Sequence, residues 1–138
     1  MTEFSVSIEI NAPPDRVLAI LLDVEHWPEW TTTVSSIRRM DNQPFGIGSR
    51  TQVKQPKLRT AIWEVTEIGR HGFTWVTRSL GLQIAGRHVV EAKEGGSKAT
   101  LSLEFSGFVA PLVARLYRNL SQRYVRMEAE GLKKRSEG

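Results

Sequence analysis

The sequence predicts an α+β fold, in which one long C-terminal helix lies on an antiparallel sheet of about seven strands. Two patterns carry this prediction. Residues 2–10 and most of residues 34–106 alternate apolar and polar side chains, which is the period of a half-buried strand. Residues 108–135 repeat apolar side chains at helical spacing. The connections between the strands are short, so the sheet is expected to be an antiparallel meander whose apolar face this helix covers.

The first strand and the segment after it are clearly marked. One face of residues 2–10 carries Phe4, Val6, Ile8 and Ile10. Pro13 and Pro14 then favour a helix start, because proline has no N–H to lose in a first turn. Two short helices are expected here, at residues 14–22 and at residues 23–30, the second interrupted by Pro28.

The middle of the chain reads almost entirely as strands. They are expected at residues 34–40, 49–54, 60–68, 73–79, 82–93 and 98–106. Residues 41–48 form a loop rich in glycine and proline, and Glu94-Gly95-Gly96-Ser97 is a hairpin turn.

Gly107 and Pro111 mark the start of the final helix. Its apolar stripe spans an arc of about 140° at 100° per residue and comprises Val109, Leu112, Val113, Leu116, Tyr117, Leu120, Tyr124, Met127 and Gly131. The opposite side carries Arg115, Arg118, Ser121, Gln122, Arg126 and Lys133. Val125 falls outside the stripe, and the pattern does not explain it.

Composition narrows the class of protein. A chain of 138 residues is expected to be a single domain, residues 1–138. It has no cysteine, and its histidines lack metal-ligand spacing, so no metal and no cofactor are expected. No apolar run approaches the ~18 residues of a membrane span, so stable membrane insertion is not expected. The absence of cysteine and of a signal pattern is compatible with a cytoplasmic location.

The net charge of +4 is concentrated on the last helix and its tail. Such a face can meet nucleic acid or an anionic membrane, or it can simply be solvated. Glu128 and Glu130 interrupt the basic residues, which favours the solvated face. No basic cluster flanks a base-stacking strand, so nucleic-acid binding is not expected.

Several short motifs follow one another along the chain. They are Ile10-Asn11-Ala12-Pro13, Val17 in the first helix, Trp27-Pro28-Glu29-Trp30, Gly48-Ser49-Arg50, Trp63-Glu64-Val65-Thr66, Phe73-Thr74-Trp75, Gly86-Arg87-His88 and the turn Glu94-Gly95-Gly96-Ser97. Their order and spacing resemble the START-like, or helix-grip, superfamily (SRPBCC), and within it most nearly the polyketide cyclase/dehydrase-like family. The resemblance covers nearly the whole chain.

The resemblance implies a strongly curved sheet that grips the long helix, with a ligand cavity between them. Together with the strand and helix phases, it implies that the ligand-binding residues are Trp63, Trp75, Ile84, His88, Leu103, Tyr117, Leu120 and Tyr124. The implied partner is a hydrophobic small molecule, and the chain is expected to be a monomer or a homodimer. The fold hosts carriers, cyclases, hydrolases and regulators, so it does not identify the ligand.

His88 is the main candidate for chemistry, because it shares the inward phase of its strand. It is either a proton donor or acceptor in the cavity or a buried structural imidazole. Tyr117 and Tyr124 either offer hydroxyls to a ligand or pack as core aromatics. Arg50, Arg78 and Arg87 fall on the outward phase, so solvent exposure is expected for them.

Three functions therefore remain open. The first is binding of a lipid or polyketide-like molecule between sheet and helix. The second is a cofactor-free cyclase or dehydratase in which His88 and a tyrosine transfer protons. The third is a membrane-surface or interaction protein that acts through Arg115, Arg118, Arg126 and Lys133.

Overall fold

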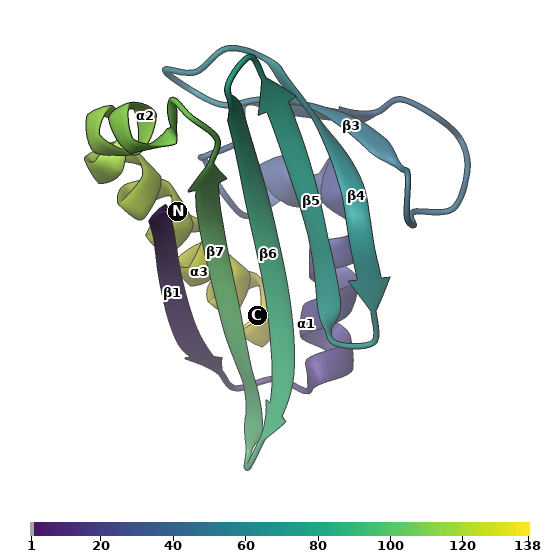
Figure 1. Cartoon of the computed structure of the whole chain (residues 1–138). Coiled ribbons are helices and arrows are strands. Elements are labelled where there is room, and N and C mark those ends of the chain that lie inside the picture. The colour runs from purple at the N-terminus through teal and green to yellow at the C-terminus, as the bar shows by residue number, and fades with distance from the viewer. Residues whose placement is uncertain (1) are drawn as a thin grey trace.

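The computed structural model of the protein describes residues 2–138 and contains one sheet of seven antiparallel strands (Figure 1). The strand order is β1-β7-β6-β5-β4-β3-β2, so only the first strand is out of sequence. The strands are β1 (Thr2–Ile10), β2 (Ser36–Arg39), β3 (Arg50–Lys54), β4 (Ala61–Gly69), β5 (Gly72–Ser79), β6 (Leu82–Lys93) and β7 (Gly96–Ser106). The predicted fold class is confirmed, and every predicted strand is present.

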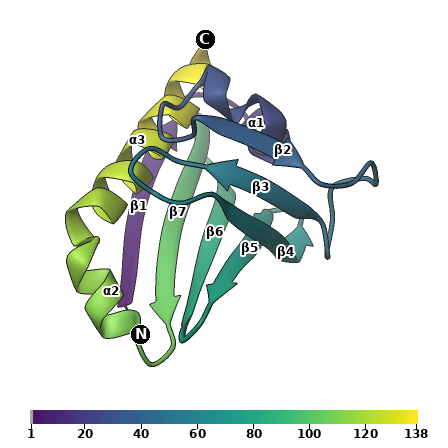
Figure 2. The same cartoon turned by 90° about the horizontal axis from the view of Figure 1, so that it is seen from above.

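Four helical segments accompany the sheet. They are α1 (Pro14–Leu22), the 3-10 helix η1 (Val24–Glu29), α2 (Ala110–Leu116) and α3 (Arg118–Glu137). Pro14 occupies the first turn of α1, as expected from its missing N–H. Seen from above, α2 and α3 run along the β1 side of the curved sheet, while α1 crosses near the C-terminal end of α3 (Figure 2).

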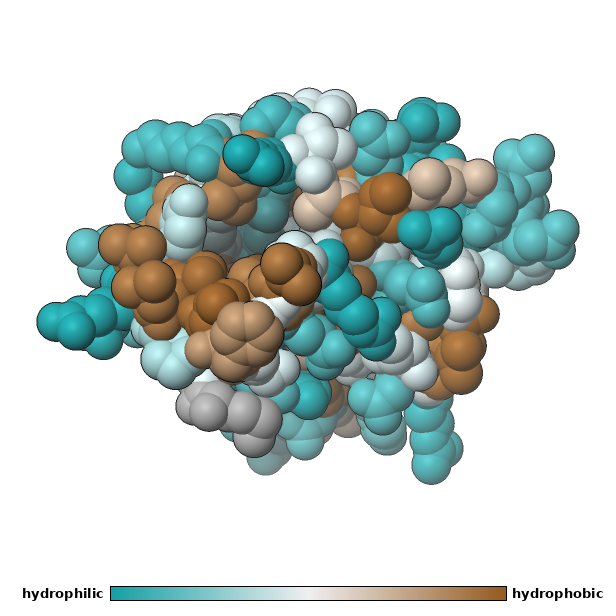
Figure 3. Space-filling model, turned by 45° about the horizontal axis from the view of Figure 1, so that its top comes forward, coloured by the Kyte–Doolittle hydropathy of each residue, from teal (hydrophilic) through white to brown (hydrophobic). Residues whose placement is uncertain are grey.

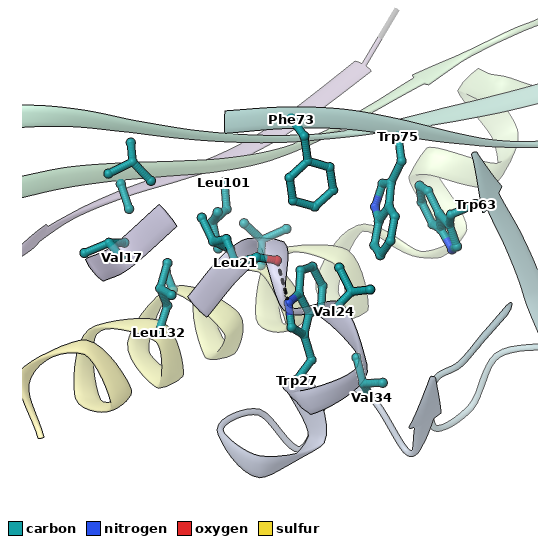
Figure 4. Close-up of a cluster of buried hydrophobic side chains, with 14 of the residues drawn as sticks. Val17, Leu21, Val24, Trp27, Val34, Trp63, Phe73, Trp75, Leu101 and Leu132 are labelled. Atoms are coloured by element: carbon teal, nitrogen blue, oxygen red, sulfur yellow. Dashed lines mark hydrogen bonds between the residues drawn. The ribbon is translucent and has the colours of Figure 1, made fainter. Parts of the chain in front are cut away.

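The main core fills the space between the sheet, α1, η1 and the C-terminal half of α3 (Figure 4). Val17 and Leu21 of α1 and Leu132 of α3 are fully buried in it. Trp27 lies beneath the sheet, where its indole N–H donates to the Leu21 carbonyl over 3.0 Å. Trp27 therefore anchors the short helices to the sheet.

The final helix differs from its prediction in two ways. It is divided at Tyr117, whose φ of −105° and ψ of 17° separate α2 from α3. Ala110 and Ala114 of α2 pack on Phe4 and Phe105, whereas α3 packs on the main core. The break lets each segment follow its own part of the curved sheet.

The buried face of the final helix is also rotated from the predicted stripe. Leu112 and Leu116 are exposed, whereas the buried residues are Ala110, Ala114, Ser121, Tyr124, Val125, Ala129, Leu132 and Ser136. Many of them are small, which allows the helix axis to lie close to its neighbours. The contact at Gly131 shows how close, because a Cβ there would lie 2.1 Å from the Trp30 carbonyl oxygen. Val125, unexplained by the pattern, belongs to the core.

Candidate functional site

A pocket of about 800 Å³ lies between the sheet and the helices. Its sheet wall includes the inward-facing residues Trp63, Trp75, Ile84, Gly86, His88, Leu101, Leu103 and Phe105. Its helix wall consists of Val113, Tyr117, Leu120, Ser121, Tyr124, Val125 and Glu128. A third wall comes from Trp27, Val34, Val53 and residues 55, 58, 59, 60 and 61 around the β3–β4 loop. The curvature of the sheet leaves this space, because the helices contact mainly its β1 and β7 side.

Aromatic rings dominate the floor of the pocket. The centroids of Trp63 and Trp75 are 5.7 Å apart, and Trp27 approaches Trp75 to 5.3 Å. Gly86 makes room for this arrangement, because a Cβ there would lie 3.1 Å from the Trp75 ring. The floor is therefore a broad apolar surface built from three elements, β4, β5 and η1.

His88 lies within this aromatic cluster. Its ring stacks on Phe73 at 4.3 Å, and Nδ1 lies 3.2 Å from the Phe73 carbonyl oxygen. The side chain is buried, and burial lowers the pKa of His88 to about 4. At neutral pH the imidazole is therefore uncharged, with Nδ1–H as the donor to Phe73 and Nε2 as an acceptor.

The two tyrosines of the helix wall have different environments. The Tyr124 hydroxyl donates to the carbonyl of Pro56, which ties α3 to the β3–β4 loop, and burial raises the pKa of its phenol. Tyr117 lies at the break between α2 and α3 and is 41% exposed. The Tyr124 hydroxyl is thus engaged with backbone, whereas Tyr117 lies at the edge of the pocket.

Glu128 is an ionisable group of the pocket that the sequence did not reveal. One carboxylate oxygen accepts a 3.0 Å hydrogen bond from the buried Thr33 hydroxyl, which in turn lies 2.9 Å from the Thr31 hydroxyl. Within residues 2–138 no Lys, Arg or His forms an ion pair with this carboxyl. Burial therefore outweighs the Thr33 hydrogen bond and raises the pKa of Glu128 to about 7.

The arginines that border the pocket are paired at the surface. Arg50 lies 4.0 Å from Glu64, and Arg87 contacts both Glu3 and Glu104. Arg78 donates to the Gln83 side chain over 2.9 Å. These guanidinium groups remain exposed or half-exposed, as the outward phase of their positions predicts.

The pocket geometry can be compared with known proteins. Residues 1–137 match the family described as "Polyketide cyclase / dehydrase and lipid transport". The chain belongs to this family. The resemblance seen in the sequence is thereby confirmed, and the family implies binding of a small hydrophobic molecule. No curated protein matches the chain.

Solved structures share the fold of this family member. The Zhui aromatase/cyclase of Streptomyces sp. R1128 superposes with a TM-score of 0.81 at 13% identity, over 99% of this chain and 93% of that one. The hypothetical protein jhp0584 of Helicobacter pylori gives 0.81 at 18% identity, over 98% and 88%. The protein TTHA0849 of Thermus thermophilus gives 0.78 at 20% identity, over 98% and 97%. At these identities the similarity establishes the fold alone.

The structure brings all the predicted ligand-binding residues of this family member around one pocket. These are Trp63, Trp75, Ile84, His88, Leu103, Tyr117, Leu120 and Tyr124. Their contact with a ligand remains a prediction. Residues 2–138 contain no group of three metal-binding side chains, and none of their helices is long and apolar enough to cross a membrane.

Two residues of the last helix line the pocket against expectation: Ser121, which the sequence placed on the opposite side from the apolar stripe, and Glu128, which it counted only among the acids that interrupt the basic residues. A usable signal was present, because Glu128 follows Tyr124 by four residues and therefore lies about 40° from it around the helix. The sequence also did not indicate the third wall, which comes from loop residues without a periodic pattern.

Proposed function

We propose that this protein binds a hydrophobic or amphipathic small molecule, such as a lipid or a polyketide-like compound, between the sheet and the C-terminal helices. The observation that carries the proposal is the pocket of about 800 Å³ with its tryptophan floor. Small-molecule sites occupy roughly 300–1,000 Å³ and are mostly apolar with a few polar groups. His88 is neutral at pH 7, so Glu128 is the group of the inner pocket walls that titrates near neutral pH.

Native mass spectrometry of protein purified from its natural host tests this proposal. A co-purifying small molecule is expected at one copy per chain. Two variants fill the pocket from opposite walls, Ile84→Trp from the sheet and Leu120→Trp from the helix. Both should lose the molecule, whereas the control Ile47→Trp, on an exposed loop, should retain it. If all three variants retained the molecule equally, its binding site would lie outside the pocket.

A second candidate function is a cofactor-free cyclase or dehydratase, and the environment of Glu128 favours it. A carboxyl group with a pKa of about 7 exchanges protons readily at neutral pH. In this scheme the Glu128 carboxylate removes a proton from a carbon beside a ligand carbonyl. The electron pair of that C–H bond attacks a second carbonyl in a cyclisation, and the new alkoxide is protonated; in a dehydration the same pair expels hydroxide, which leaves as water once protonated.

Two substitutions test which side chain of the pocket transfers the proton in this second candidate function. Glu128→Gln keeps the size of the side chain but cannot take up the proton, so turnover should fall by a factor on the order of 100 or more while ligand binding persists. His88→Ala tests the role first assigned to histidine. Unchanged turnover in His88→Ala would exclude that role, and unchanged turnover in Glu128→Gln would exclude the carboxylate.

A further inference from the structure

We propose that the end of the molecule formed by α2 and the β5–β6 turn docks on the surface of an anionic phospholipid bilayer. The docking surface is an apolar rim, defined here as Leu80, Phe108, Leu112 and Leu116. The inference goes beyond ligand binding and rests on the proposed function in one respect, that the pocket takes up an apolar molecule.

The rim is unusually exposed for apolar side chains. Leu80 is 94% exposed, Phe108 81%, Leu112 63% and Leu116 71%. Figure 3 looks toward this end of the molecule and shows apolar side chains gathered there. Exposed apolar patches of this kind mark contact sites on protein surfaces.

The four side chains come from two segments that the backbone holds together. The Phe108 ring lies against Gly81, where an added Cβ would approach it to 2.7 Å, and the Val109 amide donates to the Gly81 carbonyl over 3.1 Å. Leu112 and Leu116 follow one helical turn apart on α2. The rim is therefore a fixed feature of the fold.

The rim also borders the pocket. Leu82, directly after the β5–β6 turn, and Val113 and Tyr117, beside Leu112 and Leu116, all line the pocket wall. A bilayer in contact with the rim would thus lie next to the pocket, which gives an apolar molecule a route that avoids water.

The charged residues around the rim indicate that its partner is an anionic bilayer. Arg78, Arg115 and Arg118 flank the rim and are exposed, and the sequence has no Asp or Glu in residues 69–90 or 107–127. Arginines beside exposed leucines suit a bilayer with anionic headgroups, because the apolar side chains enter the interface while the guanidinium groups meet phosphate. A second copy of the chain fits less well, since a two-fold interface would place like-charged arginines opposite one another.

Vesicle flotation tests the inference, with vesicles of phosphatidylcholine alone and of phosphatidylcholine mixed with phosphatidylglycerol. The protein should float with the anionic vesicles and much less with the neutral ones. The double substitution Leu112→Glu/Leu116→Glu should weaken binding at least about tenfold. Arg115→Gln/Arg118→Gln should weaken it by a factor on the order of ten and flatten its salt dependence.

Matched controls lie away from the rim. Ile47→Glu changes an equally exposed apolar residue. Ile47 belongs to the loop before β3, and this loop lies across the molecule from α2 (Figures 1 and 2). Arg38→Gln/Arg70→Gln removes two exposed arginines from elsewhere. Both control proteins should float like the wild type.

Three results would overturn the inference. They are no flotation of the wild type with anionic vesicles, unchanged flotation of Leu112→Glu/Leu116→Glu, and a concentration-dependent dimer in solution that this double variant disperses. Binding of the fluorescent probe anilinonaphthalene sulfonate in vesicle-free buffer separates this inference from the proposed function. Probe binding without flotation would refute the docking alone, whereas loss of both would refute the ligand pocket as well.

Discussion

At the residue scale, the Glu128 carboxyl couples the pocket to pH. Its pKa is raised from 4.5 to about 7 by burial, so the folded protein holds a proton that the unfolded chain releases between these values. This proton stabilises the folded state. The contribution of Glu128 to the free energy of unfolding is complete below about pH 4.5 and is lost as the pH rises through 7. At about 1.4 kcal/mol per pKa unit, this amounts to about 3 kcal/mol at most.

Glu128→Gln should remove this dependence, because glutamine does not titrate. Above pH 7 the variant should be more stable than the wild type by about 1–3 kcal/mol, since no charge is buried. Chemical denaturation at several pH values between 4 and 8 measures the difference. The exposed Glu130→Gln, half a helical turn away, is the control and should keep the wild-type profile.

The contribution of His88 to folding stability changes with pH in the opposite direction. Burial lowers its pKa from 6.5 to about 4, so the unfolded chain takes up a proton first as the pH falls. The stability of the neutral folded form is complete above pH 6.5 and is lost as the pH drops toward 4. In Glu128→Gln the stability should therefore rise with pH because of His88, and the decrease that Glu128 causes in the wild type should be absent. A Glu128→Gln profile that still declines between pH 5 and 7 would mean that another group carries the decline.

At the element scale, the approach of α3 to η1 depends on Gly131. A Cβ there would lie 2.1 Å from the Trp30 carbonyl oxygen, which is backbone and cannot rotate away. Alanine gains about 1 kcal/mol in helix propensity over glycine, but overpacking costs about 1–3 kcal/mol or more. A contact of 2.1 Å with backbone places the overpacking cost at the upper end of this range, so Gly131→Ala should destabilise the protein by about 1–2 kcal/mol.

Thermal or denaturant unfolding measures the effect of Gly131→Ala. The control is Gly69→Ala, because no atom lies within 4 Å of an added Cβ at that position. Its stability should stay within about 0.5 kcal/mol of the wild type. Equal stability of the Gly131 variant would show that α3 tolerates a larger separation from η1.

The contact between α3 and the β3–β4 loop depends on the Tyr124 hydroxyl, which donates to Pro56. Tyr124→Phe removes this donor and should cost about 1 kcal/mol, with faster amide exchange in residues 57–59. Tyr117→Phe is the matched control, since Tyr117 is 41% exposed and its hydroxyl forms no hydrogen bond to residues 2–138. Unchanged amide exchange in Tyr124→Phe would show that the loop is held by other contacts.

At the scale of the whole molecule, the sequence predicted the sheet well because period-two alternation reports directly on which face of a strand is buried. The buried face of the final helix was harder to predict from the sequence. The apolar residues of this helix include Leu112 and Leu116, which the fold leaves at the surface, whereas its buried side includes the small residues Ser121 and Ala129 and the close contact at Gly131. Periodicity identifies apolar residues, but the curvature of the sheet decides which side of the helix it meets.

The residues of the candidate site could also be predicted only in part. Its sheet residues, Trp63, Trp75 and His88, follow from strand phase and lie on the pocket wall. Glu128 did not follow, because a charged residue on a basic helix is ordinarily solvated. Its four-residue spacing from Tyr124 was a signal for the pocket side of the helix, but the packed structure is needed to show that the buried face of α3 extends to it.

The pocket itself is the central claim, and titration with anilinonaphthalene sulfonate tests it most directly. We predict one probe bound per chain, binding weakened at least about tenfold in Ile84→Trp and Leu120→Trp, and wild-type binding in Ile47→Trp. Circular dichroism should show that all three variants are folded. Equal probe binding by the wild type and by both pocket-filling variants would contradict the claim that the space between the sheet and α3 is a ligand site.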